Sequence, residues 1–256
     1  MTPLLETRGL SKTFGGLKAV QNVDLRVDAN RIVSVIGPNG AGKTTFFNCL
    51  SGIYRPDGGG IWLGEREITG LAPHQVCRLG LSRTFQNIRL FPEMSVLENV
   101  LVAQFQHRSI SPLPLLLRSR HFCEEEKLNR DEALGFLDFV GLAHVADSIS
   151  SNLAYGLQRR LEIARGLATK PRILLLDEPA AGMNPQEAVE MVGLISRIRD
   201  RGVAILLIEH HMKVVMSISD EILVLDHGVQ IAHGAPEHVR NDPQVIRAYL
   251  GDEISN

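Results

Sequence analysis

Short apolar runs recur along the chain and predict an alternation of strands and helices. Apolar and polar residues alternate at 23–27, which is typical of a half-buried strand, and the run at 31–36 predicts a more deeply buried one. The residues at 43–51 suit a helix, and Gly52 is placed to end it. A stretch rich in Pro and Gly at 55–60 predicts a turn. Further strands are predicted at 61–68, 172–176, 203–208 and 222–226, with a hairpin around Gly228.

The middle of the chain has a helical pattern. Ser95 and Glu98 have the spacing of a capping box, which predicts the start of one helix, and a second helix is predicted at 122–140. Beyond it, helices and strands alternate again, beginning with a helix whose apolar residues share one face at 157–168. Other helices are predicted to open at Pro73, at Asn184 and near Pro236 and Pro243.

This order of elements predicts an α/β fold. Strands that alternate with helices favour a parallel sheet core covered by helices, accompanied by a small antiparallel β subdomain. We expect residues 1–86 and 160–256 to form this core, and residues 87–159 to form an all-helical subdomain within a single domain of 256 residues.

Composition narrows the class of protein. The chain has 27 Lys and Arg against 29 Asp and Glu, and it is 44% hydrophobic, which excludes a disordered chain. The longest apolar runs have about six residues, whereas a membrane-spanning helix needs about 18. Glu6 stands where a signal peptide would be apolar, so we expect the chain to stay in the cytosol. The near-neutral charge gives no reason to expect a nucleic-acid partner.

The cysteines do not indicate a special site. Their number, three, is odd, and Cys49, Cys77 and Cys123 lack CxxC spacing. A disulfide framework and a structural zinc site are therefore both disfavoured.

A glycine-rich stretch between a predicted strand and a predicted helix matches G-x-x-x-x-G-K-[ST]. Gly40 and Gly42 let the backbone turn its N–H groups toward a phosphate, and Lys43 would neutralise the β- and γ-phosphates. Thr44 would offer its hydroxyl to Mg²⁺, so we predict ATP and Mg²⁺ as cofactors. The alternative is a glycine-rich turn with a chance Lys-Thr pair. The predicted nucleotide-binding residues of this loop are Gly37, Pro38, Asn39, Gly40, Ala41, Gly42, Lys43, Thr44 and Thr45.

Two acids end the apolar strand at 172–176. Because unpaired buried charge is costly, Asp177 and Glu178 call for a cation or hydrogen bonds. We predict that Asp177 holds Mg²⁺, and that Glu178 acts as the general base on the attacking water. The alternative is a strand that simply emerges into solvent.

A phosphate loop does not distinguish a kinase, a GTPase, a helicase and a transport ATPase, but other segments resemble one family. The sequence LAYG at 153–156 resembles the signature loop of ATP-binding cassette (ABC) proteins, and AAGMN at 180–184 resembles their D-loop. Gln86 in SRTFQN resembles the Q-loop glutamine, His210 the switch histidine, and Phe14 the adenine-stacking aromatic. The signature residues are Leu153, Ala154, Tyr155 and Gly156, and those of the D-loop are Ala181, Gly182, Met183 and Asn184.

The resemblance implies a role for each residue. Phe14 would stack on adenine, Gln86 would contact Mg²⁺ or the attacking water, and His210 would donate a hydrogen bond to the γ-phosphate. Alone, Phe14 could equally be a core residue and His210 a structural one. The family's signature loop completes the nucleotide site of a second ATPase subunit, which implies a homodimer or a heterodimer.

Several positions depart from the usual motif. Ala154 and Tyr155 replace Ser and Gly, Leu157 stands where Gln is usual, and Asn184 replaces the D-loop Asp. Backbone N–H groups at a helix N-terminus still bind phosphate, so we expect activity to survive.

Longer segments narrow the resemblance. LAYG followed by QRRLEIARGLATKP, together with LLDEPAAGMNP and VIRAYLG, resembles the ATP-binding subunits of branched-chain amino acid importers. That implies two transmembrane permeases, a periplasmic binding protein contacted indirectly, and a peripheral place on the cytoplasmic side of the inner membrane. Urea uptake and lipopolysaccharide export remain alternatives. The segment 107–121, with four leucines, is either a loop packed on the helical subdomain or a permease or membrane contact.

Two other classes of protein also carry a phosphate loop. A soluble cassette ATPase of DNA repair or translation would carry two cassettes or a long coiled-coil insertion. A small-molecule phosphotransferase would be a monomer without a signature loop. The sequence shows neither two cassettes nor such an insertion, and it contains the LAYG segment that resembles a signature loop.

Overall fold

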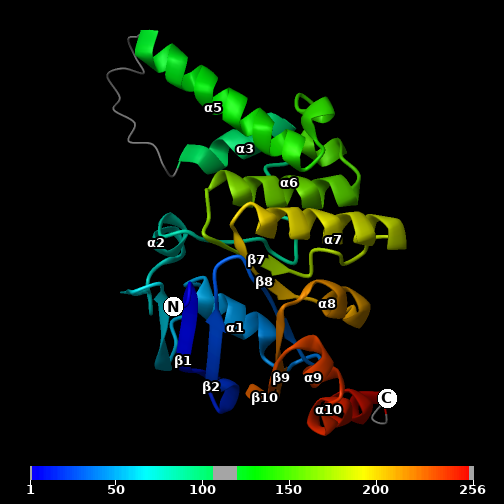
Figure 1. The fold of residues 1–256 in the computed structure, drawn as a ribbon. Coiled ribbons are helices and arrows are strands. Elements are labelled where there is room, and N and C mark those ends of the chain that lie inside the picture. Colours follow the sequence, from blue (N-terminus) through cyan, green and yellow to red (C-terminus); the bar gives the residue numbers. More distant parts are fainter. Residues whose placement is uncertain (1, 106–119, 254–256) are drawn as a thin grey trace. The chain divides into compact units, whose positions relative to one another are not determined.

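The computed structural model describes residues 2–105 and 120–253 (Figure 1). Contacts between residues divide the chain into two compact units. The first comprises the residues up to Arg83 and from Arg172 onward, and the second is Thr84–Pro171. None of the helices in the described residues is long and apolar enough to cross a bilayer.

The first unit holds one ten-stranded sheet in the order β5-β4-β1-β2-β10-β9-β3-β8-β7-β6. Neighbours from β9 to β6 run parallel, whereas β1, β2, β4 and β5 pair antiparallel. This arrangement confirms the predicted α/β fold with a parallel core and an antiparallel portion. The strands are β1 (Leu5–Phe14), β2 (Leu17–Val27), β3 (Ile32–Ile36), β4 (Gly58–Leu63), β5 (Arg66–Glu67), β6 (Leu81–Arg83), β7 (Ile173–Asp177), β8 (Ala204–Ile208), β9 (Glu221–Asp226) and β10 (Val229–Gly234).

Alternate residues of each strand point to opposite faces of the sheet, so both faces carry apolar side chains, and helices cover them. Val33 and Val35 of β3 belong to the same buried cluster as Phe46. Ile36, at the end of β3, belongs to another cluster, against which Tyr249 packs. The helices of this unit are α1 (Lys43–Leu50), α2 (Pro73–Arg78), α7 (Pro185–Asp200), α8 (Met212–Ile218), α9 (Pro236–Arg240) and α10 (Pro243–Glu253).

One local prediction fails in the antiparallel portion, and one strand there was not predicted. The turn predicted at 55–60 is wrong in its second half, because β4 already begins at Gly58. A Cβ on Gly59 would lie 2.3 Å from the Gly9 carbonyl oxygen, so this glycine permits a close approach to β1. Strand β1 itself was not predicted, since the register shifts of its pairing interrupt any regular alternation.

The second unit is helical. It contains α3 (Val96–Gln104), α5 (Arg120–Phe139) and α6 (Tyr155–Ala168), with short 3₁₀ turns at Ala143–Val145 and Ser150–Asn152. Helix α3 packs against both α5 and α6. The predicted capping box is confirmed, because the Glu98 N–H donates to Ser95 Oγ over 3.1 Å and the Ser95 N–H donates to Glu98 Oε2 over 2.7 Å.

The boundaries of this unit differ from the predicted subdomain. The boundary predicted between residues 159 and 160 falls inside α6, which belongs entirely to the second unit. Residues 107–119 of the leucine-containing segment lie outside the described residues.

Candidate nucleotide-binding site

The predicted phosphate loop joins β3 to the start of α1. Gly42, with φ 97°, precedes the helix, and a Cβ there would lie 2.2 Å from the Ala19 carbonyl oxygen. A Cβ on Gly37 would lie 2.0 Å from the Leu225 carbonyl oxygen. Gly40, with φ 79°, has no neighbouring atom within 4 Å of such a Cβ. The loop is therefore packed against β2 and β9 while its outer turn stays open, as a phosphate cradle requires.

Lys43 closes this loop with its own side chain. Its Nζ donates to the carbonyl oxygens of Gly37 over 2.7 Å and Pro38 over 2.8 Å. Burial lowers the pKa of Lys43, and the carboxylates of Glu178 and Asp177 oppose that shift. The ammonium therefore lies at the loop beside two acids, and Thr44 follows it with an exposed side chain.

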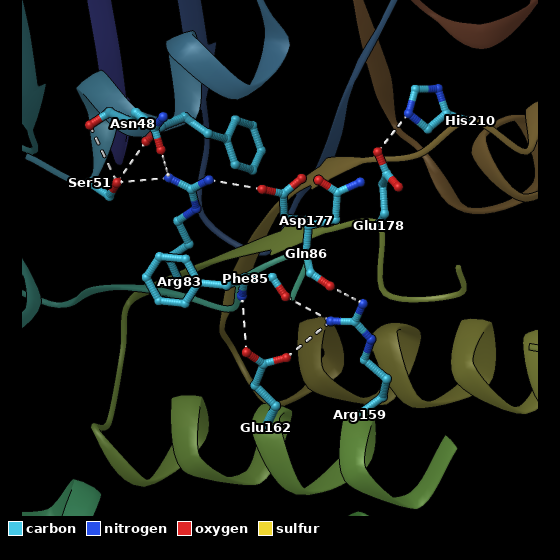
Figure 2. A network of polar contacts seen from close by, with 11 residues as sticks. Asn48, Ser51, Arg83, Phe85, Gln86, Arg159, Glu162, Asp177, Glu178 and His210 are labelled. Carbon is cyan, nitrogen blue, oxygen red and sulfur yellow. Dashed lines mark hydrogen bonds and ion pairs between the residues drawn. The ribbon is translucent and has the colours of Figure 1, made fainter. Parts of the chain in front are cut away.

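The carboxylate of Asp177 is paired with an arginine. Asp177 is the last residue of β7 and only 2% exposed, and its Oδ2 accepts a hydrogen bond from Arg83 over 2.8 Å. Arg83 also donates to Asn48 Oδ1 over 2.7 Å and to Ser51 Oγ over 3.1 Å (Figure 2). The sequence analysis missed Arg83. No apolar run marks this position, because β6 is the three-residue strand Leu81–Arg83 and its place beside β7 is set by the fold.

Glu178 and His210 lie together. Nε2 of His210 is 2.6 Å from Oε1 of Glu178 (Figure 2). Glu178 has φ 49°, a left-handed conformation that residues other than glycine seldom adopt, and its N–H donates to the Ile208 carbonyl over 2.9 Å. The end of β8 thus fixes the direction of the acid that was predicted as general base.

Glu209, which was not predicted from the sequence, accepts hydrogen bonds from the segment after Glu178 and from His210. It is 2% exposed, and its Oε1 accepts the Ala180 N–H over 3.0 Å. Its Oε2 accepts the His210 N–H over 3.2 Å. The start of the predicted D-loop and the predicted switch histidine are therefore held by one buried carboxylate.

Asn184, at the end of the D-loop segment, caps a helix. Its Oδ1 accepts the Glu187 N–H over 2.9 Å, and the Glu187 carboxylate accepts the Asn184 N–H over 2.9 Å. An amide performs this capping as well as an aspartate would, so the departure from the usual residue is accommodated locally.

Phe14 is not a core residue. Its side chain is 41% exposed at the end of β1, and its ring meets Tyr54 edge-on with centroids 5.2 Å apart. The Lys12 ammonium lies 5.3 Å from the centre of the ring. An exposed ring that is held from the side can present a face to a planar ligand.

A further contact reaches the phosphate loop from the C-terminal helix. The Tyr249 hydroxyl is hydrogen-bonded to the Gly37 backbone. Burial raises the pKa of Tyr249 to about 12, and this hydrogen bond opposes the shift. Tyr249 was missed because nothing in its local sequence connects it with a loop about 210 residues earlier.

The predicted signature loop begins a helix in the second unit. Ala154 is the N-cap of α6 and makes no side-chain capping bond, Leu153 is buried, and Tyr155 is 45% exposed. Any anion bound at this helix start therefore depends on backbone N–H groups. Gln86 lies in the same unit with an exposed side chain, and its carbonyl accepts a hydrogen bond from Arg159. These residues belong to the second unit, whereas the phosphate loop belongs to the first.

A glycine loop between a strand and a helix, with an acidic pair at the end of a parallel strand of the same sheet, defines a P-loop nucleotide-binding protein. A family model described as "ABC transporter" matches residues 20–181, and one described as "Branched-chain amino acid ATP-binding cassette transporter" matches residues 229–254. The chain belongs to the ABC transporter family, and it is an ATPase of that family.

Individual relatives match over nearly the whole chain. The high-affinity branched-chain amino acid transport ATP-binding protein LivG of Salmonella typhimurium is 53% identical over 251 residues, covering 98% of both chains. The lipopolysaccharide export system ATP-binding protein LptB of Acidithiobacillus ferridurans is 36% identical, covering 99% of both. A crystal structure of the ADP conformation of an ATP-binding cassette of an ABC transporter is 32% identical, with a TM-score of 0.85 over 98% of this chain and 100% of that one.

Proposed function

We propose that this chain is the ATP-hydrolysing subunit of an importer of branched-chain amino acids. The observation that carries the proposal is the 53% identity to such a subunit over 98% of both chains. The match of residues 229–254 to a model specific to branched-chain transporters supports it. A lipopolysaccharide export subunit of similar length is only 36% identical, which makes export the weaker candidate.

MgATP is the proposed form of the substrate. The cradle fits a triphosphate, because the glycine backbone is open at Gly40 and the cation of Lys43 lies beside it. The Thr44 hydroxyl and the Asp177 carboxylate are hard oxygen donors of the kind that Mg²⁺ prefers, and Gln86 is the proposed third contact. When bound, Mg²⁺ neutralises charge on the β- and γ-phosphates. Phe14 offers its exposed ring to the adenine.

Glu178 is the proposed general base. Its carboxylate is directed by the 2.6 Å contact with His210 and by its own left-handed backbone conformation. A carboxylate held in this way takes a proton from water as the water attacks the γ-phosphate. His210 positions the base, and Lys43 stabilises the charge that develops on the phosphate oxygens.

The proposed assembly contains a second ATPase chain, identical or different. Leu153, Ala154, Tyr155 and Gly156 would contact the nucleotide held by that partner, and the D-loop residues Ala181, Gly182, Met183 and Asn184 would lie at the contact between the chains. Two transmembrane permeases would receive the movement of the pair, and a periplasmic binding protein would deliver the solute. The chain itself would lie peripherally on the cytoplasmic side of the inner membrane.

Purification of the native complex from detergent-solubilised membranes tests this proposal. We expect two permeases and a periplasmic binding protein to co-purify with the chain, and ATP-dependent leucine uptake after the complex is reconstituted in vesicles. Co-purification with lipopolysaccharide or urea transport proteins, or a complex that hydrolyses ATP without transporting leucine, would overturn the assignment of substrate.

A further inference from the structure

Helix α6 carries a buried ion pair one turn after the signature loop. Arg159 and Glu162 have side chains 3% and 7% exposed, and Arg159 Nη1 is 3.2 Å from Glu162 Oε2. Burial raises the pKa of Glu162, and hydrogen bonds from the Phe85 N–H and from Arg159 oppose that shift. A buried ion pair costs free energy unless further hydrogen bonds satisfy both partners.

The segment that contains Gln86 supplies those hydrogen bonds. Arg159 Nη1 donates to the Phe85 carbonyl over 2.7 Å, and Nη2 donates to the Gln86 carbonyl (Figure 2). Glu162 Oε1 accepts the Phe85 N–H over 3.1 Å, and Glu162 also accepts a backbone hydrogen bond from Arg89. Two side chains of one helix therefore hold the backbone of residues 85–89 at several points.

The same arginine reaches the signature loop. Arg159 donates to the Tyr155 hydroxyl from Nη2 over 2.9 Å and from Nε over 3.2 Å, and its guanidinium carbon lies 5.3 Å from the centre of the Tyr155 ring. Tyr155 stands where the related signature motif usually has glycine, which could not make this contact. The departure at Tyr155 thus adds a side-chain link that the usual motif lacks.

We propose that Arg159 and Glu162 are positioning residues that join the 85–89 segment to the signature loop through Tyr155. Gln86, which would contact this chain's own nucleotide, would then move as one rigid piece with the signature loop, which would contact the partner's nucleotide. A planar guanidinium can hold two carbonyls and a hydroxyl at once, which a lysine ammonium cannot do with the same geometry. This inference rests on the proposed roles of Gln86 and of the signature loop.

Arg159→Lys in the complete transporter tests the link. We expect kcat per folded molecule to fall by about 10-fold or more, because lost hydrogen bonds to a charged group typically change an equilibrium by that factor. The Kd for ATP of the isolated chain should change by less than about twofold, since the phosphate loop is untouched. The matched control is Arg160→Lys on the same helix, because Arg160 contacts the Val140 carbonyl instead. A merely structural role would lower Tm and leave kcat unchanged below the transition.

Tyr155→Phe gives a second test that does not threaten the fold, because it removes one hydroxyl from a partly exposed ring. We expect a loss of about 2- to 10-fold in kcat, and no further loss when it is combined with Arg159→Lys. Hydrogen exchange should rise together at 85–89 and 154–157 in Arg159→Lys, although not in Arg160→Lys. Independent, multiplying effects of the two substitutions, or an unchanged kcat in both variants, would overturn the link. If the wild-type complex itself showed no ATPase activity, the proposed function would be wrong, and the inference that rests on it would fall too.

Discussion

The phosphate loop and the Gln86 segment are held in different ways. Residues 37–45 pack against the backbone of β2 and β9, and side-chain hydrogen bonds that stay within the loop come from Lys43, which bonds carbonyls five and six residues before it. The backbone at 85–86 is fixed by Arg159, which lies 73 and 74 residues further along the chain. One motif carries its own geometry, whereas the other receives it from a distant helix.

The difference bears on what each segment can do. A self-contained loop keeps its shape while the elements around it move, so it suits the residue set that binds the nucleotide phosphates. A segment that is hydrogen-bonded to a helix moves with that helix. The segment at 85–86 is therefore suited to transmit a conformational change between the nucleotide and α6. This difference is tested by substitutions that disturb either the loop's own backbone conformation or a contact from a distant residue, but not both.

The largest expected effect comes from breaking the self-contained loop. Gly42→Ala places a Cβ 2.2 Å from the Ala19 carbonyl oxygen, so the loop must move. We expect ATP affinity to fall by at least about 100-fold, because the collision with Ala19 adds to the cost of about 1–2 kcal/mol that a left-handed conformation has in a residue other than glycine. Gly40→Ala is the control, because Gly40 also has a positive φ but faces open space. Calorimetric titration with ATP checks both, and an equal loss in the two variants would contradict the role of the collision.

Arg83→Met tests a contact between residues distant in sequence, the ion pair that Arg83 forms with Asp177 in the first unit. It leaves the buried carboxylate of Asp177 without its 2.8 Å partner, and breaking a buried pair typically costs about 3–5 kcal/mol. Urea denaturation should report that loss of unfolding free energy. The same change in a surface pair, Arg31→Met opposite Asp220, should cost at most about 1 kcal/mol. Similar losses in the two variants would show that burial of the pair is unimportant.

Tyr249→Phe tests a side chain of the C-terminal helix that is hydrogen-bonded to the phosphate loop. The substitution removes the hydroxyl that is hydrogen-bonded to the Gly37 backbone and keeps the ring packed against the core. We expect ATP affinity to weaken by about 2- to 10-fold, the range for one neutral hydrogen bond. A loss as large as that of Gly42→Ala would contradict the view that the loop holds itself.

Ala154→Ser should have the smallest effect. The serine would restore the usual residue at the N-cap of α6, where the alanine makes no side-chain hydrogen bond. If backbone N–H groups carry the phosphate contact, kcat should rise by less than about threefold, because one hydroxyl adds at most a modest net interaction. Steady-state ATPase assays of the assembled transporter check this value. A gain of about two orders of magnitude would mean that a side-chain contact is required.

The same comparison explains what could be predicted from the sequence. The phosphate loop was found because its nine residues are consecutive, and the acid pair because it ends an apolar strand. The roles of Glu178 and His210 were assigned separately, although their 2.6 Å contact was not anticipated. The placement of Glu178 is compatible with its predicted role as base, whereas Nε2 of His210 contacts Glu178, and both roles remain predictions.

The supporting residues were not predictable for the same physical reason. Arg83, Glu209 and Tyr249 each act on a partner that is remote in sequence, and no local pattern marks them. Strand β1 escaped prediction because its irregular register hides the alternation. Sequence reasoning therefore recovered the longer strands of the parallel core and the motifs, whereas the short strand β6 and the contacts that hold the motifs required the fold.

The most direct test of the proposed mechanism is Glu178→Gln, which keeps the shape of the side chain and removes its basicity. We predict that this variant binds ATP as the wild type does, accumulates as an ATP-bound dimer in light-scattering measurements, and hydrolyses ATP about 10²- to 10⁴-fold more slowly. Undiminished steady-state hydrolysis by Glu178→Gln would contradict the assignment of Glu178 as the general base.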